Sequence, residues 1–161
     1  MATCHLFLAR RRDPHMIAIE PITQESFRFG IAWLLLSVAL TLHVIDEALT
    51  DFLSVYNQAV QAIRKRVPFI PLPIFTFRVW LAGLCLGIAL AFCLSYIAFR
   101  GVRLAIVIAY PVAILMFANG VGHLAASLYR RRFMPGVYSS PFLVAASTYL
   151  FYCAEGARHV V

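Results

Sequence analysis

The sequence predicts an all-α integral membrane bundle of about four transmembrane helices. Of its 161 residues, 62% are hydrophobic and only 13% are charged, and the mean hydropathy is +0.82. Soluble domains are about half apolar and about one quarter charged, so this composition belongs to the membrane class. The second observation is that the apolar residues gather in four segments, separated by short breaks rich in Arg, Pro or Gly.

Each segment is judged against the thickness of a bilayer, which takes about 20 apolar residues of helix to cross. The second and third segments exceed that length, the fourth is short but adequate, and the first qualifies if other helices shelter its polar end. Ser140-Pro141 is typical of a helix start, and Gly101 makes the second and third helices a tight hairpin. We predict helices at about 29–52, 74–99, 102–129 and 141–157, a transmembrane domain over 28–161, and a disordered or interfacial extension over 1–27.

The longest connection between predicted helices runs from Ser54 to Pro73. Three of its last six residues are Pro68, Pro71 and Pro73, which exclude a regular helix because proline lacks the backbone donor. The apolar residues between these prolines suit the membrane surface. We expect this segment to lie there as an irregular stretch of chain.

The net charge of +7 comes from short basic clusters between the apolar segments, such as Arg130-Arg131-Arg132. Such clusters anchor helix ends at lipid headgroups, and nucleic-acid binding is not expected. Trp33 and Trp80 read as aromatic residues that face lipid or the interface. The four cysteines form no disulfide framework. The expected location is a bacterial plasma membrane, crossed several times, with membrane lipid as the surroundings.

The end of the first predicted helix, LHVIDEALTDF, carries three of the seven acidic residues of the chain. At about 100° per residue, Asp46, Glu47 and Asp51 lie about −60°, +40° and +80° around the helix from His43. These four residues therefore share one face, and the rest of the surface is apolar. Ionisable residues within a membrane are costly and mark functional sites, although Asp51 is equally well explained by water beyond the membrane.

The third and fourth segments carry a similar pattern. Asn119 and His123 are four residues apart and stack on one helix face, beside small residues that allow close helix packing. Glu155 and His159 are also four apart, but near the end of the chain. Hydroxyl groups that could join the same network belong to Tyr110, Tyr149 and Tyr152.

The motif His43-Val44-Ile45-Asp46-Glu47 resembles the signature of the HXXEE family of small integral membrane proteins, whose function is not established. The later stretch NGVGHLAASLYRRRFMPG, with Asn119 and His123, is similar to the second polar block of that family. The resemblance covers about residues 31–152. Asp46 departs from the pattern, because the family usually has a glutamate there; the carboxylate is kept but is one methylene shorter.

The polar residues predict a metal site or an acid/base site inside the bundle. In the metal version His43, Glu47 and His123 bind a divalent ion, with Asp46 and Asn119 behind or beside them, so the candidate ligands are His43, Glu47, Asn119 and His123. In the proton version Glu47 or Asp46 exchanges a proton and His43 relays it. The candidate catalytic residues are His43, Asp46, Glu47 and His123. Either version suits an isomerase, hydratase or cyclase acting on a lipophilic small molecule.

Two other classes of function stay open. Chains of acidic and histidine residues also serve a carrier or a proton or ion pathway, and four helices would then need to form a homodimer. A structural membrane subunit could use the same polar face to bind a partner helix. The purely structural interpretation of His43, Asp46 and Glu47 is a buried hydrogen-bond network that only stabilises the bundle. Motifs for serine hydrolases, dinucleotides, nucleoside triphosphates and zinc peptidases do not occur in the chain.

Overall fold

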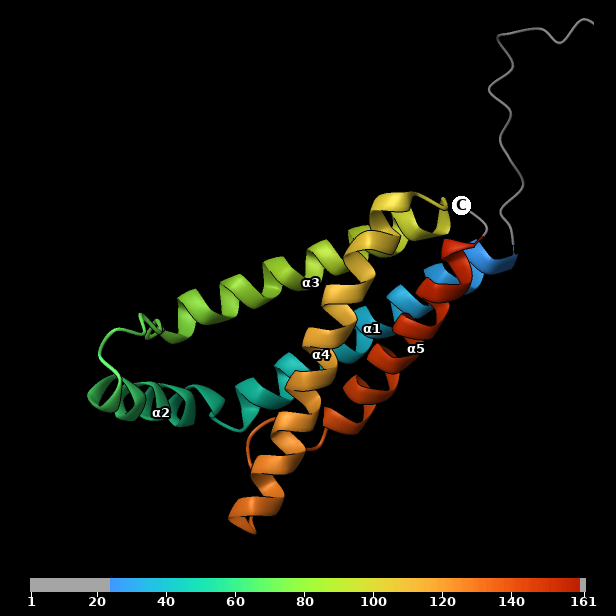
Figure 1. Cartoon of the computed structure of the whole chain (residues 1–161). Coiled ribbons are helices and arrows are strands. Elements are labelled where there is room, and N and C mark those ends of the chain that lie inside the picture. The colour runs from blue at the N-terminus through green and yellow to red at the C-terminus, as the bar shows by residue number, and fades with distance from the viewer. Residues whose placement is uncertain (1–23, 160–161) are drawn as a thin grey trace, which may run out of the picture.

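The computed structural model describes residues 24–159, and within that range every regular element is a helix (Figure 1). The N-terminal extension predicted over 1–27 falls mostly outside the described residues, and the helix already includes residues 24–27. The five helices are α1 (Gln24–Leu49), α2 (Phe52–Arg66), α3 (Phe77–Phe99), α4 (Arg103–Arg130) and α5 (Ser140–Arg158).

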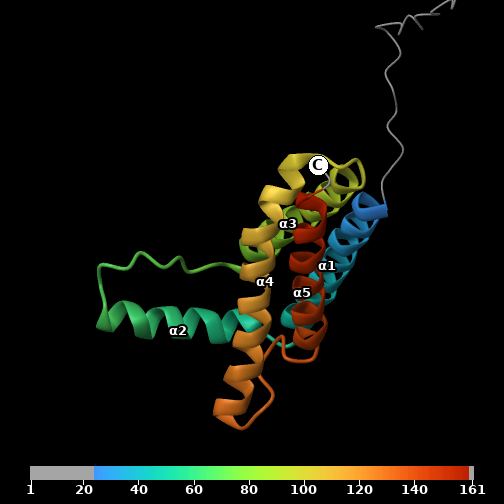
Figure 2. The same ribbon diagram turned by 45° about the vertical axis from the view of Figure 1, so that its right-hand side comes forward.

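The core forms where α1 packs against α3 and α5 and where α4 packs along α5. Alanine allows these helices to approach closely: Ala32, Ala105 and Ala154 are all fully buried. The tight turn at Gly101, which has a positive φ of 65°, is confirmed. Beyond it α3 and α4 diverge and contact different partners, so they do not pack along each other as a hairpin would (Figure 2).

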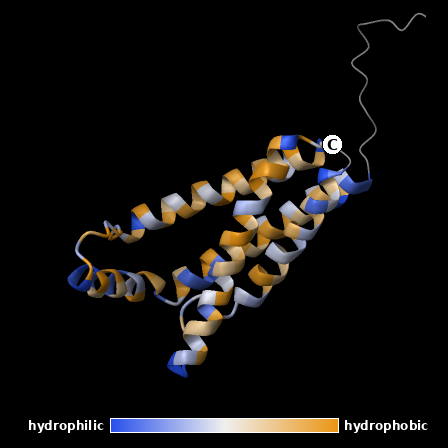
Figure 3. Cartoon of the chain, in the orientation of Figure 1, coloured by the Kyte–Doolittle hydropathy of each residue, from blue (hydrophilic) through white to orange (hydrophobic). Residues whose placement is uncertain are grey.

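Three helices, α1, α3 and α4, are long and apolar enough to cross a membrane. Figure 3 shows that hydrophobic residues dominate α3 and α4, whereas polar residues mark the ends of the elements. The predicted fourth span, α5, is 19 residues long. It is not among the candidate spans, because its Ser, Thr and Tyr residues and Glu155 lower its hydropathy.

The prediction of an irregular connection over residues 54–73 is wrong for its first part. The chain forms α2 there, because the stretch up to Arg66 contains neither Pro nor Gly, and the prolines that end it begin only at Pro68. The first predicted helix is likewise broken. It ends at Leu49 rather than at residue 52, since Asp51 takes the left-handed conformation with φ 57°, which Asp tolerates better than most residues.

The break at Asp51 redirects the chain away from the bundle, and residues 67–76 bring it back to α3 (Figures 1 and 2). The Ser54 hydroxyl donates to the Asp51 carboxylate at 2.6 Å across this break. The interpretation of the tryptophans as lipid-facing is wrong. Trp33, on α1, is fully buried in the core of the bundle, and the Trp80 side chain is only 9% exposed.

Candidate metal centre

The end of α1 supplies the first part of the site. His43 and Glu47 lie one helical turn apart and are 1% and 5% exposed, so both point into the bundle as their spacing predicts. Their facing atoms, His43 Nε2 and Glu47 Oε1, are 3.5 Å apart. Asp46 is half-buried on the same side. Asp51 does not share this face, because the helix has ended before it, and its side chain is exposed.

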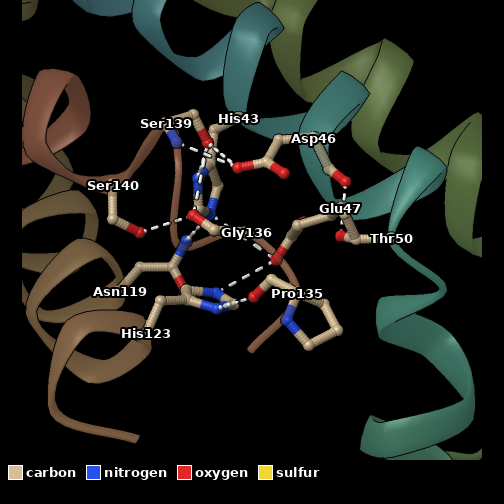
Figure 4. A network of polar contacts seen from close by, with 10 residues as sticks. All are labelled: His43, Asp46, Glu47, Thr50, Asn119, His123, Pro135, Gly136, Ser139 and Ser140. Atoms are coloured by element: carbon tan, nitrogen blue, oxygen red, sulfur yellow. Dashed lines mark hydrogen bonds and ion pairs between the residues drawn. The ribbon is translucent and has the colours of Figure 1, made fainter. Parts of the chain in front are cut away.

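α4 brings the second polar pair against the first (Figure 4). His123 Nε2 lies 3.1 Å from Glu47 Oε1, and the Asn119 amide nitrogen lies 3.2 Å from His43 Nε2. The two imidazole rings meet edge to face, with their centroids 4.9 Å apart. The prediction that these two helix faces converge is therefore confirmed. That the residues catalyse a reaction or bind a metal stays a prediction.

A loop between α4 and α5 completes the site, and sequence reasoning missed its contribution. The Ser139 backbone N–H and hydroxyl both donate to Asp46 Oδ2, at 2.9 and 2.8 Å, and the same hydroxyl lies 2.9 Å from His43 Nδ1. Ser139, not Ser140, is the residue before α5. Its side chain does not cap that helix but turns to the site. The only sequence signal for it was its place after the Pro135-Gly136 turn.

The hydrogen bond from His123 fixes which of its nitrogens faces Glu47 with a lone pair. His123 Nδ1 lies 2.6 Å from the carbonyl oxygen of Pro135, which can only accept a hydrogen bond. Nδ1 must therefore carry a hydrogen. In the neutral ring, Nε2 then points a lone pair at the Glu47 carboxylate, and two acceptors would face each other at 3.1 Å. That arrangement requires a cation or an extra proton between them.

His43 also carries its hydrogen on Nδ1, because of its contact with Ser139. The Ser139 hydroxyl has one hydrogen, and the Asp46 carboxylate at 2.8 Å is a nearer and stronger acceptor than the Gly136 carbonyl at 3.3 Å. The hydroxyl therefore donates to Asp46 and accepts from Nδ1–H of His43. His43 Nε2 is then also a lone-pair nitrogen, and it accepts from the Asn119 amide at 3.2 Å. Metal-binding histidines usually donate their other ring N–H to a carbonyl, carboxylate or similar acceptor, which holds the tautomer and the ring. Both histidines show that arrangement.

The spacing of the three groups suits one small ion. One atom each from His43, Glu47 and His123 all lie within 4.8 Å of one another, and all three residues are buried. Bonds of about 2.0–2.2 Å in a tetrahedral site place ligand atoms about 3.3–3.6 Å apart. The distances from Glu47 Oε1 to the two histidine nitrogens, 3.5 and 3.1 Å, are close to that separation. Two histidines and one carboxylate, with a position left open, are a ligand set of catalytic zinc sites.

The other polar residues singled out from the sequence lie elsewhere. Glu155 and His159 line a cavity of about 620 Å³ at the opposite end of α1, together with Glu25 and Arg28. Tyr149 and Tyr152 line the same cavity, and the Tyr110 ring packs edge-on against Phe151. Arg130, Arg131 and Arg132 are exposed. None of these groups joins the polar network drawn in Figure 4.

Comparison with known protein families supports the resemblance indicated by the motif His43 to Glu47. The model of a family described as "Protein of unknown function with HXXEE motif" matches residues 33–150, which is most of the chain. The chain belongs to the HXXEE family. Searches of curated proteins and of solved structures found no match for it.

The structure gives the HXXEE motif of this protein a physical meaning. The first and last motif residues, His43 and Glu47, lie together inside the site, whereas Asp46 is bonded to Ser139. The shorter side chain of Asp46 still reaches its partner. In this HXXEE protein the fourth motif residue, Asp46, therefore contacts Ser139, which in turn contacts His43.

Gly136 permits the loop between α4 and α5 to lie directly against the rings of His43 and His123. It has a φ of +80°, and an added Cβ would lie 2.9 Å from the His123 ring and 3.1 Å from His43. Gly136→Ala should therefore lower the free energy of unfolding by about 1–3 kcal/mol, since a left-handed backbone and a displaced ring both cost energy. Gly122→Ala, on α4 with open space around it, is the control and should be neutral or stabilising. Thermal melts in detergent compare the two, and equal stability of the two variants would contradict this account of the loop.

Proposed function

We propose that this HXXEE protein is a multi-pass membrane metalloenzyme. A divalent ion held by His43 Nε2, Glu47 and His123 Nε2 acts there on a lipophilic molecule. The observation that supports this most is the pair of lone-pair nitrogens converging on one buried carboxylate, each fixed by a hydrogen bond on its far side. His43 Nε2 accepts from the Asn119 amide, but neutral His123 Nε2 and the Glu47 carboxylate are two acceptors that face each other, and a purely structural polar network would gain nothing from that pair.

Charge balance supports an ion at this place. With both histidines neutral, the site contains a buried Glu47 carboxylate and a half-buried Asp46 carboxylate. An uncompensated charge away from water costs several kcal/mol. Asp46 receives two hydrogen bonds from Ser139, whereas Glu47 has only histidine nitrogens beside it. A divalent cation would balance the charge of both acids and satisfy the lone pair of His123 Nε2, and at His43 Nε2 it would replace the hydrogen bond from the Asn119 amide.

A cavity beside the site provides a place for a substrate. It has a volume of about 330 Å³, lies between α2 and α4, and is lined by His123 and Asn119 at its polar end. Apolar side chains, among them Phe52, Ala59 and Met134, form most of the remaining wall. Ligand cavities typically combine such an apolar lining with a few placed polar groups. The Asn119 amide borders both the site and the cavity, where it can orient an oxygen atom of a substrate or water.

The ion would supply a Lewis acid at its open position, which polarises a bound oxygen or generates a hydroxide. The protein residues have separate parts in this scheme. Glu47 and the two histidines would bind the ion. Ser139 and the Pro135 carbonyl hold the imidazole rings of His43 and His123, and Asp46 holds Ser139. Isomerisation, hydration or cyclisation of a lipid or isoprenoid suits such a site. The bundle would sit in a bacterial plasma membrane, with α5 as a fourth span shielded by α1 and α4.

The alternative is a proton in place of the metal. The 3.1 Å between His123 Nε2 and Glu47 Oε1 is also a hydrogen-bond distance, so a protonated ring paired with the carboxylate would satisfy the same atoms. A carrier or proton pathway would use that form. The two functions differ in one measurable respect, which is whether the protein retains a metal ion.

Metal binding by purified protein tests the proposal. The protein is stripped with a chelator in detergent, equilibrated with Zn²⁺, and analysed for bound metal and thermal stability. We expect one ion per chain, and a stabilisation of about 2.7 kcal/mol when free Zn²⁺ is 100 times its dissociation constant. His123→Gln should lose the ion. His159→Gln, which changes an exposed histidine at the other end of the bundle, should keep it. A wild-type protein that retains no ion would favour the proton function.

A further inference from the structure

A second cavity lies next to the one beside the site and shares two of its lining residues. The second cavity has a volume of about 310 Å³ and lies between α2 and α3, with Trp80 and Gly83 in its lining. Phe52 and Tyr56, at the start of α2, line both cavities. These two side chains therefore border both cavities. Together the cavities make a two-part groove, which His123 lines in its first part and α3 lines in its second.

Aromatic rings form a continuous wall along the groove. The ring of Phe52 lies 5.4 Å from that of His123 on one side and 6.1 Å from that of Trp80 on the other. Tyr56 stacks on Phe75 at 5.9 Å, deeper in the second cavity. Such a wall offers apolar contact over its whole length. Hydrogen-bonding side chains of the site stand only at the His123 end.

The second cavity is held open by specific bonds rather than by loose packing. The Asn57 side chain donates to the carbonyl oxygen of Phe75 at 2.9 Å and accepts from its N–H at 3.2 Å. The Tyr56 hydroxyl donates to the carbonyl oxygen of Pro73 at 3.3 Å. These bonds tie residues 73–75 to α2, and Thr76 then starts α3. The lining is thus preformed, as is usual for ligand cavities.

We propose that the substrate is a long single-chain lipid, such as a fatty or isoprenoid alcohol or aldehyde, with one polar end group. This inference rests on the proposed function. The polar end lies at His43, Glu47 and His123, and the chain fills the first cavity, crosses Phe52 and Tyr56, and ends in the second.

The groove favours this occupant over others on chemical grounds. A compact molecule would fill the first cavity and leave the second without use. A sugar or nucleotide would find few hydrogen-bond partners away from His123, because the Tyr56 hydroxyl is already bonded to Pro73 and the rest of the second cavity is mostly apolar. A lipid with two chains would need a second groove at the same polar end. Val79 and Gly83, which line the second cavity, are exposed on α3, so this part of the groove opens to the outside of the bundle, as a substrate dissolved in a bilayer requires.

Trp80 provides a direct probe of the second cavity. Trp33→Phe removes the other tryptophan, which is buried in the core, so that the fluorescence comes from Trp80 alone. The zinc-loaded protein in detergent is titrated with dibromostearyl alcohol, whose bromine atoms at mid-chain quench tryptophan on contact. We expect saturable quenching that excess oleyl alcohol reverses and hexanol does not.

A matched pair of glycine variants separates binding in the groove from contact with the micelle. Gly83 lines the second cavity and Gly87 lies one turn further along α3, and an added Cβ at either meets no atom within 4 Å. Gly83→Leu should weaken the binding of dibromostearyl alcohol at least about tenfold, because the side chain fills the cavity, and Gly87→Leu should leave it unchanged. Both variants should retain zinc, since neither residue touches the site.

The results distinguish failure of the groove from failure of the metal site. Quenching that rises linearly without saturation, or that is identical in the two glycine variants, would overturn the lipid groove even if zinc is bound. Saturable quenching that Gly83→Leu weakens, in a protein that retains no zinc, would keep the groove and remove the metal. Displacement by hexanol as readily as by oleyl alcohol would contradict the long chain.

Discussion

Glu47→Gln is expected to abolish metal retention while the protein stays folded. Glutamine keeps the shape of the side chain but is neutral and a weak ligand, so the affinity for Zn²⁺ should fall by more than about 100-fold. Loss of a group that merely orients a ligand already costs about 10–100-fold. Without metal, the variant should melt at the same temperature as the wild type or higher. The new amide can donate to the lone pair of His123 Nε2, which the carboxylate cannot do.

The control for this variant is Glu25→Gln. Glu25 is a carboxylate on the same helix, paired with Arg28 at 3.7 Å near the surface. It should change neither metal content nor stability by much, because exposed ion pairs contribute about 0–1 kcal/mol. If Glu47→Gln instead lowers the melting temperature of metal-free protein clearly and leaves metal content unchanged, the cluster is packing and not a site.

Ser139→Ala should weaken zinc binding by about 10–100-fold, although Ser139 is not a ligand. The variant removes the hydroxyl that accepts from His43 Nδ1–H and donates to Asp46, so His43 loses the bond that holds its ring and tautomer. A buried N–H left without an acceptor should also lower the free energy of unfolding by about 1–3 kcal/mol. Titration with zinc and thermal melts measure the two effects.

Ser147→Ala separates the role of Ser139 from the general cost of losing a buried hydroxyl. Ser147 is a buried serine of α5 whose hydroxyl donates to the carbonyl oxygen of Val144. It should cost some stability and leave zinc affinity unchanged. Equal zinc affinity in the two serine variants would show that Ser139 does not position His43.

Local periodicity was sufficient to predict the core of the site. His43 and Glu47 are one turn apart on one helix, as are Asn119 and His123 on another, so helical geometry alone placed each pair on one face. Their burial followed from the apolar surroundings. The prediction that the faces meet needed one further assumption, which is that polar residues in a membrane helix seek one another.

Contacts that depend on tertiary structure could not be read in the same way. Ser139 lies in a loop, 93 residues from Asp46 in sequence, and nothing in its neighbourhood distinguishes it from Ser140. The break at Asp51 was hidden because the residues around it favour a continuous helix. That break decides where α2 begins and so places Phe52 against His123. The substrate groove therefore depends on a backbone conformation that the pattern of apolar residues does not record.

X-ray absorption spectroscopy of the zinc-loaded protein tests the central claim most directly. We predict a zinc ion with two imidazole nitrogens and oxygen ligands at about 2.0–2.2 Å. His123→Gln should lose the zinc ion and its signal, and His159→Gln should leave the spectrum unchanged. A zinc environment without imidazole, or one that His43→Gln and His123→Gln leave unaltered, would contradict a metal centre at His43, Glu47 and His123.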